Sequence, residues 1–148
     1  WLALTPATEH SGCMRMIAGS HKWIDVVHHD IDDNKNLLSR GQSIEKGIDE
    51  KNATFLSLQP GEFSLHHGNT AHASNSNNAD ERRIGIAIRY VATQVRPVDR
   101  QDSAIVVRGH DEYGHFLSET APVNDFDSNA ITEHEKMMNI RQMVILDK

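Results

Sequence analysis

The sequence predicts a mainly β protein, a jelly roll or barrel with one helix appended towards its C-terminal end. Short apolar or alternating runs separated by polar turns dominate the first ninety residues, as in folds built from many short strands. Only one long segment, near the C-terminal end, has the character of a helix. The length of 148 residues fits one domain, and 38% hydrophobic residues suffice for a core surrounded by long polar loops.

The strands of this core are expected where an alternating or apolar run is bounded by Pro, Gly, Asn or Asp. In chain order they are residues 1–5, 13–17, 53–58, 62–67, 70–75 and 83–92. Residues 22–52 are charged and without a hydrophobic pattern, so we expect a long surface loop there, with at most one helical turn.

The chain changes character after Pro97, so residues 1–97 are taken as the β core and residues 98–148 as a C-terminal extension. Residues 103–108 are expected to add one strand. Asp127 and Ser128 are typical helix-capping residues, and the segment after them predicts a helix over about residues 129–146.

The core is expected to be incomplete at its N-terminal end. Native termini are usually polar and frayed, whereas Trp1 opens the apolar run Trp-Leu-Ala-Leu-Thr as if in the middle of a strand. We therefore expect partner strands of this core to lie upstream of Trp1.

Composition excludes several classes of partner. Fifteen Lys and Arg against 21 Asp and Glu give a formal net charge of −6 without a basic run, which argues against a nucleic-acid or polybasic membrane contact. No apolar run approaches the roughly 20 residues of a membrane span. The single cysteine, Cys13, fits a reducing, cytoplasmic environment. Homo-oligomerisation stays open.

Residues 83–92 place two kinds of side chain on opposite faces, because successive residues of a strand alternate. Three isoleucines are expected to face a packed layer: Ile84, Ile86 and Ile88. Arg83, Gly85 and Ala87 lie on the other face, where small residues leave room for a ligand whose carboxylate pairs with the guanidinium. The alternative is that Arg83 is an ordinary surface charge.

Histidines on the two preceding strands are candidates for the same interior. His72 shares a face with Ser74, and a neutral imidazole is a common metal ligand. His67 lies one strand earlier, so that His67, His72 and Arg83 converge if the strands close into a barrel. With ten histidines in the chain, any single one is weak evidence and is more often a structural residue.

His28 and Asp30 form a His-x-Asp pair, which is half of a two-histidine, one-carboxylate iron site that His72 would formally complete. The pair falls in the patternless segment, where a metal site would be poorly held. We therefore expect His28 and Asp30 to lie in a surface loop far from His72.

Several runs carry a family resemblance: WLALT at residues 1–5, SGCMRMIAGSH at 11–21, PGEFSLHHG at 60–68 and HAS at 72–74. Asn77 follows, and Arg83 stands eleven residues after His72. Together these runs resemble the phytanoyl-CoA dioxygenase family of iron(II)- and 2-oxoglutarate-dependent oxygenases. The resemblance covers nearly the whole chain and implies a double-stranded β-helix, a jelly roll of the cupin type.

The resemblance implies a role for each matching residue. His72 corresponds to the distal histidine ligand of iron, Arg83 to the residue that binds the far carboxylate of 2-oxoglutarate, and Ser74 to a hydrogen-bond donor to that carboxylate. Trp1 matches a tryptophan close to the cosubstrate, and His67 matches a histidine near the distal ligand without an assigned role. The implied reaction hydroxylates an unreactive C–H bond of a small molecule with O₂, converts 2-oxoglutarate to succinate and uses ascorbate as reductant.

Two departures from the family pattern, Ser11 and Ala18, are remote from the implied chemistry. In the family the His-x-Asp pair precedes the tryptophan strand, so the resemblance implies that two iron ligands lie upstream of Trp1 and that this chain alone is inactive. Halogenating relatives lack the carboxylate, so hydroxylase and halogenase both stay open. The alternative outside enzymes is a cupin-like binding or structural β-domain in which His72 and Arg83 are incidental.

Overall fold

The computed structural model describes residues 1–24, 26–31, 41–44, 48–98 and 100–146. The chain forms two compact units, Trp1–Arg89 and Tyr90–Lys148, and each is described by itself. The first unit holds most of the strands and the second holds the only α-helix of the described residues. The chain is therefore mainly β with one C-terminal helix, as the sequence predicts.

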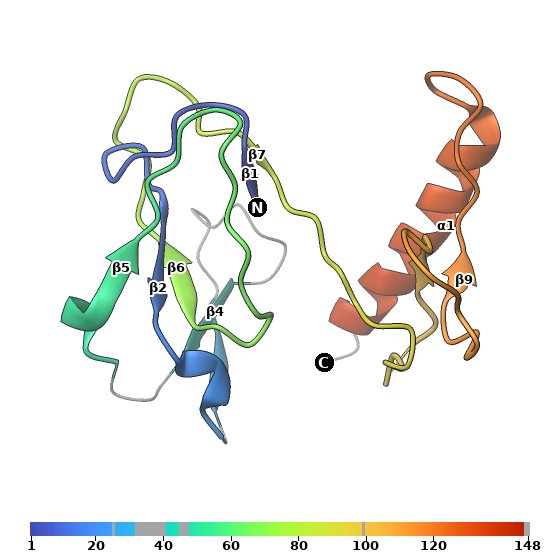
Figure 1. Cartoon of the computed structure of the whole chain (residues 1–148), viewed down its shortest axis with the longest axis horizontal. Helices are drawn as coiled ribbons and strands as arrows, with labels where there is room; N and C mark the ends of the chain where they lie inside the picture. Colours follow the sequence, from blue (N-terminus) through green and yellow to red (C-terminus); the bar gives the residue numbers. More distant parts are fainter. Residues whose placement is uncertain (25, 32–40, 45–47, 99, 147–148) are drawn as a thin grey trace. The chain divides into compact units, whose positions relative to one another are not determined.

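A three-stranded antiparallel sheet carries His72. Its strands, in order across the sheet, are β5 (Ala53–Phe55), β2 (Met14–Ile17) and β6 (His72–Ser74), which Figure 1 shows side by side. Met16 of β2 is paired with His72 of β6. Directly paired residues share a face of a sheet, so His72 projects on the same face as Met16, which is buried.

A second, two-stranded sheet carries the segment around Arg83. β1 (Leu2–Ala3) pairs with β7 (Gly85–Ile86) in antiparallel register, with Leu2 opposite Ile86. Phe63 adds an isolated bridge to Leu2. The strand expected over residues 62–67 is thus reduced to this one bridge. The fully buried Ala3 fixes the inner face of the sheet, because it lies opposite Gly85.

The expectation that the isoleucines after Arg83 face a packed layer is wrong. Ile84, Ile86 and Ile88 are 46%, 45% and 57% exposed. In the described part of the chain β1 is the only strand paired with β7, so the sheet is narrow and its isoleucine side stays in contact with solvent. Alternation in the sequence identified the two faces correctly, but not the absence of a covering layer among these residues.

The expectation of a patternless loop over residues 22–52 is also wrong for its described part. An antiparallel pair of strands, β3 (His28–Ile31) and β4 (Gly41–Ile44), occupies it, with 3₁₀ turns at Ser20–Lys22 and Glu50–Asn52. All four residues of β3 are exposed. Neither face of that strand is buried, so the sequence shows no alternation to reveal it. Residues 25, 32–40 and 45–47 of this stretch lie outside the described residues.

The second unit joins a short parallel pair to the helix. β8 (Ser103–Ala104) pairs with β9 (Leu117–Ser118), and α1 spans Ser128–Leu146. The helix begins as predicted, because Asp127 Oδ1 accepts the N–H of Asn129 at 2.9 Å and caps the first turn. No helix of the described residues is long and apolar enough to cross a membrane.

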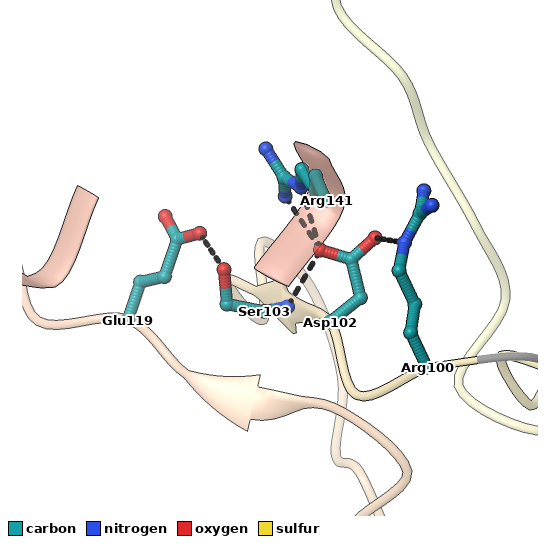
Figure 2. A network of polar contacts seen from close by, with 5 residues as sticks. All are labelled: Arg100, Asp102, Ser103, Glu119 and Arg141. Carbon is teal, nitrogen blue, oxygen red and sulfur yellow. Dashed lines mark hydrogen bonds and ion pairs between the residues drawn. The ribbon is translucent and has the colours of Figure 1, made fainter. Parts of the chain in front are cut away.

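A carboxylate anchors α1 beside β8. Arg141 of the helix donates to Asp102 Oδ1 from Nε at 3.0 Å and from Nη2 at 2.6 Å (Figure 2). The Ser103 N–H donates to the same oxygen at 2.9 Å, and Arg100 lies 3.9 Å from the other oxygen. Burial alone would raise the pKa of Asp102, but these hydrogen bonds and the two cations outweigh it and lower the pKa.

Candidate functional site

A buried serine fixes the backbone that leads into β6. Ser20 is 2% exposed, and its Oγ donates to the Ile17 carbonyl at 2.7 Å. The same oxygen accepts the N–H of Ala71 at 2.8 Å. Ser20 therefore ties the end of β2 to the residue immediately before His72, so that the position of His72 is set by a buried contact although its own ring is exposed.

The His72 ring is oriented by the backbone carbonyl of Thr70, two residues before it. Nδ1 lies 2.8 Å from the carbonyl oxygen of Thr70. A carbonyl oxygen accepts hydrogen bonds and donates none, so Nδ1 carries the proton of the neutral ring and Nε2 keeps its lone pair. Histidines that bind metals usually have this arrangement, in which one ring nitrogen donates to a carbonyl and the other faces the ion. His72 thus presents Nε2 as a ligand atom.

His66, which the sequence reasoning passed over, packs against His72. The two ring centroids lie 5.6 Å apart with the planes tilted by 55°. Burial and the charge of the neighbouring His72 lower the pKa of His66. The Trp1 nitrogen donates to the carbonyl of Ser64 at 2.8 Å, two residues before His66. The segment that carries His66 is therefore hydrogen-bonded to the residue that precedes β1.

Trp1 covers Gly85 and contacts Arg83. A Cβ at position 85 would overlap the Trp1 indole, so only glycine lets the ring lie against β7. Arg83 Cζ stands 5.4 Å from the Trp1 ring centroid, within the range of a cation–π contact. The space expected above Gly85 is consequently filled by Trp1 rather than open to a ligand. Among the residues that the structure describes, no carboxylate pairs with the half-buried Arg83.

These residues form two contacting groups, His66 with His72, and Trp1 with Arg83 and Gly85. The backbone bonds between Trp1 and Ser64 join the two segments, and the five residues are called the Trp1–His72 cluster. It contains three of the candidates from the sequence. The Ser64 N–H donates a backbone hydrogen bond to the Trp1 carbonyl at 2.9 Å. The Ser64 hydroxyl is buried and has no hydrogen-bond partner among the described residues.

The other two candidates have different neighbours. The His67 ring lies 5.6 Å from the ring of His21, and its Nδ1 accepts the N–H of Asn69 at 3.1 Å. Ser74 is exposed on β6, opposite Met14. Residues 64–67 are not a strand, so the period of two that assigned His67 to the face of the site does not apply to them. No signal in the single sequence distinguishes His66 from His67.

A cavity of about 780 Å³ lies in the first unit and is lined by both His28 and His72. His28 lies on strand β3 rather than in the expected loop, and it lines the same cavity as His72. Asp30 accepts a hydrogen bond from Gln42 Nε2 at 3.2 Å. Within the described residues no group of three His, Cys, Asp or Glu side chains could hold a metal ion, so His28, Asp30 and His72 do not form the literal triad.

Residues 1–85 match the family model described as Phytanoyl-CoA dioxygenase (PhyH). The chain belongs to the phytanoyl-CoA dioxygenase family. The matched residues contain the whole Trp1–His72 cluster, so the family assignment rests on the same segment as the candidate site. The assignment agrees with the resemblance drawn from the sequence runs.

Two solved structures are similar over nearly the entire chain. One, titled "non-heme monooxygenase; ThoJ apo", is 37% identical with a TM-score of 0.83, and the match covers 99% of this chain and 52% of that one. The other, titled "Non-heme monooxygenase, ThoJ-Ni complex", is 35% identical with a TM-score of 0.74, covering 99% and 50%. This chain spans about half the length of these relatives. A comparison with curated protein sequences found no match.

Proposed function

We propose that this chain holds the distal iron ligand and the cosubstrate clamp of a non-haem iron(II)- and 2-oxoglutarate-dependent oxygenase. The observation that carries the proposal is the Trp1–His72 cluster. Within it, the His72 ring is held at Nδ1 by the Thr70 carbonyl and packs against His66. Arg83 lies against the Trp1 ring and has no carboxylate partner among the described residues. The phytanoyl-CoA dioxygenase family and the two monooxygenase structures support the same class of chemistry.

The donor set of the cluster fits both groups. His72 Nε2 suits iron, which in such oxygenases is held by two histidines and one carboxylate. Arg83 suits the far carboxylate of 2-oxoglutarate, since a guanidinium binds a carboxylate through two hydrogen bonds. The buried and unpaired hydroxyl of Ser64 is a further polar atom in need of a partner. The His-x-Asp pair is expected from residues that precede Trp1 in a longer polypeptide.

The residues around the proposed site then have defined roles. Bound iron and 2-oxoglutarate together supply the oxidising power that activates O₂ towards an unreactive C–H bond. Thr70 holds the His72 ring so that Nε2 faces the ion, and Arg83 fixes the orientation of the cosubstrate. Trp1 covers the backbone beside that arginine and excludes water from it. The cavity lined by His72 has the volume of a small-molecule site, so we expect a small organic substrate.

Succinate release tests the proposal. The assay compares this chain with a polypeptide extended upstream to the length of the solved relatives, with iron(II), ascorbate and a panel of small substrates. In the extended polypeptide, Arg83→Ala should raise the 2-oxoglutarate concentration for half-maximal rate by about 30-fold or more, because removing one side of a buried charge pair costs on the order of 2–5 kcal/mol. Its exposed neighbour Arg82 provides the matched control. Arg82→Ala should change the 2-oxoglutarate concentration for half-maximal rate by less than about twofold.

The outcomes separate the alternatives. Absence of succinate from both polypeptides would favour a non-catalytic β-domain, and an unchanged 2-oxoglutarate requirement after Arg83→Ala would remove Arg83 from the site. Mass spectrometry of the product in the presence of chloride separates hydroxylation from halogenation.

A further inference from the structure

The cavity beside His72 is bounded on one side by the sheet face that carries Arg15. Arg15 is paired with Ala73 of β6, and Ile17 is paired with Ala53 of β5, so these four residues share one face of the sheet. All four line the cavity of about 780 Å³. Alanine at two of the positions leaves room for a ligand above this face.

The guanidinium of Arg15 is already paired within the cavity wall. Its Nη1 donates to Glu50 Oε2 at 2.7 Å, and its Nη2 donates to Glu50 Oε1 at 3.3 Å. The Arg15 side chain is only 20% exposed, whereas that of Glu50 is 67% exposed. The backbone that carries Glu50 is held as well, because the carboxylate of Asp49 caps the 3₁₀ turn by accepting the N–H of Lys51. The ion pair is therefore a built feature of the wall.

This pair leaves the cavity without an unbalanced formal charge. Among the described residues that line it, Arg15 and Glu50 are the only Arg, Lys, Asp or Glu side chains. The other titratable groups are His28 and His72, and imidazoles are mostly uncharged at pH 8. A carboxylate or an ammonium group that entered the cavity would lose hydration and find no unpaired charge of opposite sign.

We propose that the Arg15–Glu50 ion pair makes this cavity selective for uncharged organic molecules that carry a hydroxyl or carbonyl oxygen. Glu50 occupies the guanidinium and so excludes a carboxylate ligand from it. A guanidinium has five N–H groups. Glu50 accepts from two of them, and the others can donate to an uncharged oxygen. The inference rests on the proposed function, because it names the class of substrate for the same cavity.

Three probes with one hydrocarbon body test this selectivity: 3-phenylpropan-1-ol, 3-phenylpropionate and 3-phenylpropylamine. Isothermal calorimetry of the full chain at pH 8, without iron or 2-oxoglutarate, measures the affinity for each probe. We expect the alcohol to bind about tenfold or more tightly than either charged probe, because a charge that is buried without a partner is costly.

Glu50→Gln is the decisive variant, because it frees the charge of Arg15 and keeps a polar side chain of the same length at an exposed position. The affinity for 3-phenylpropionate should rise by about tenfold or more, as expected for hydrogen bonds to a charged group. Glu9→Gln, at an exposed position outside the cavity lining, is the matched control and should leave all three affinities within about twofold. Binding of the carboxylate to Arg83 would be equal in the two variants, so the difference between them reports on the cavity.

A further variant locates the bound alcohol. Ala53→Leu adds a larger side chain to the cavity wall and should weaken the binding of 3-phenylpropan-1-ol, with an unchanged circular dichroism spectrum. Unchanged binding of the alcohol would place it outside the cavity and contradict the inference.

The inference would be overturned if the wild type bound the alcohol and either charged probe equally well. An unchanged carboxylate affinity in Glu50→Gln, or no binding of any probe, would overturn it too. None of these results bears on succinate release by the extended polypeptide, so the proposed function would stand. Conversely, the expected affinities without succinate release would support the charge selectivity of the cavity and count against an oxygenase.

Discussion

Ser20 shows how one buried hydroxyl sets the geometry of an exposed ligand. Its hydroxyl donates to the Ile17 carbonyl and accepts the Ala71 N–H. We expect Ser20→Ala to lower the free energy of unfolding of the first unit by about 1–3 kcal/mol, since the Ala71 N–H would be left buried and unpaired. Urea unfolding measures this, and the exposed Ser76→Ala is the control, with a change within about 0.5 kcal/mol. Equal effects of the two substitutions would contradict the bridging role.

Gly85 is a residue whose missing side chain matters. Gly85→Ala should displace the Trp1 indole, because the new Cβ occupies its place against β7. Overpacking of this kind costs about 1–3 kcal/mol. The change should appear as a red shift of tryptophan fluorescence and a lower midpoint of thermal unfolding. Gly68→Ala, with no atom near the added Cβ, should leave the fluorescence unchanged.

At the same scale, sequence patterns indicated some of the candidate residues and not His66. His72 and Arg83 could be selected because strand parity and spacing both pointed to them, and their roles stay predictions. The structure gives His72 a ring contact with His66 and Arg83 a contact with Trp1. His66 could not be selected, because it lies in an irregular segment where a side chain's direction depends on contacts far away in the sequence. Trp1 over Gly85 is a contact of the same non-local kind.

Among the elements, α1 depends on one carboxylate for its link to β8. Arg141 and Asp102 are 36% and 22% exposed, so solvent screens the pair and we expect Asp102→Asn to cost only about 1 kcal/mol at pH 7. Glu119→Gln, which alters the neighbouring bond to Ser103, is a milder control. Circular dichroism of the helix during thermal unfolding measures both.

The same carboxylate predicts a pH dependence for the second unit. The pKa of Asp102 is lower in the folded chain than the value of about 3.9 expected when unfolded. The contribution of the Asp102 carboxylate to the free energy of unfolding is therefore complete above about pH 4. It is lost as the pH falls through the lowered pKa of the folded state. Asp102→Asn should remove this part of the acid dependence. A variant with the same acid dependence as the wild type would show that Asp102 is not its source.

Elements differed in how far the sequence revealed them. α1 could be predicted because its capping residues and its length are local signals. β2 could be predicted from its short apolar run, which the structure confirms over Met14–Ile17. β3 and β4 could not, since exposed strands carry no alternation and are specified by pairing with each other. The strand expected over residues 83–92 is reduced to β7, because it is paired only where β1 lies opposite it.

The molecule as a whole presents much apolar surface for a chain with a net charge of −6. On the isoleucine side of the β1–β7 sheet, Phe63 is 63% and Ile86 is 45% exposed. We expect Phe63→Ser with Ile86→Thr to reduce the fluorescence of the dye ANS while the free energy of unfolding stays within about 0.5 kcal/mol per site. A fall of several kcal/mol would instead mean that these side chains are packed.

The register of the two sheets also governs the order of events when the chain folds. Leu2 pairs with Ile86 and Met16 pairs with His72, so each contact closes a long loop before any stabilisation is gained. Such non-local pairing is typical of slow folding, in milliseconds to seconds. During synthesis β1 emerges long before β7, the strand with which it pairs. Chaperone demand and expression temperature should therefore affect yield more than the stability of the finished fold would suggest.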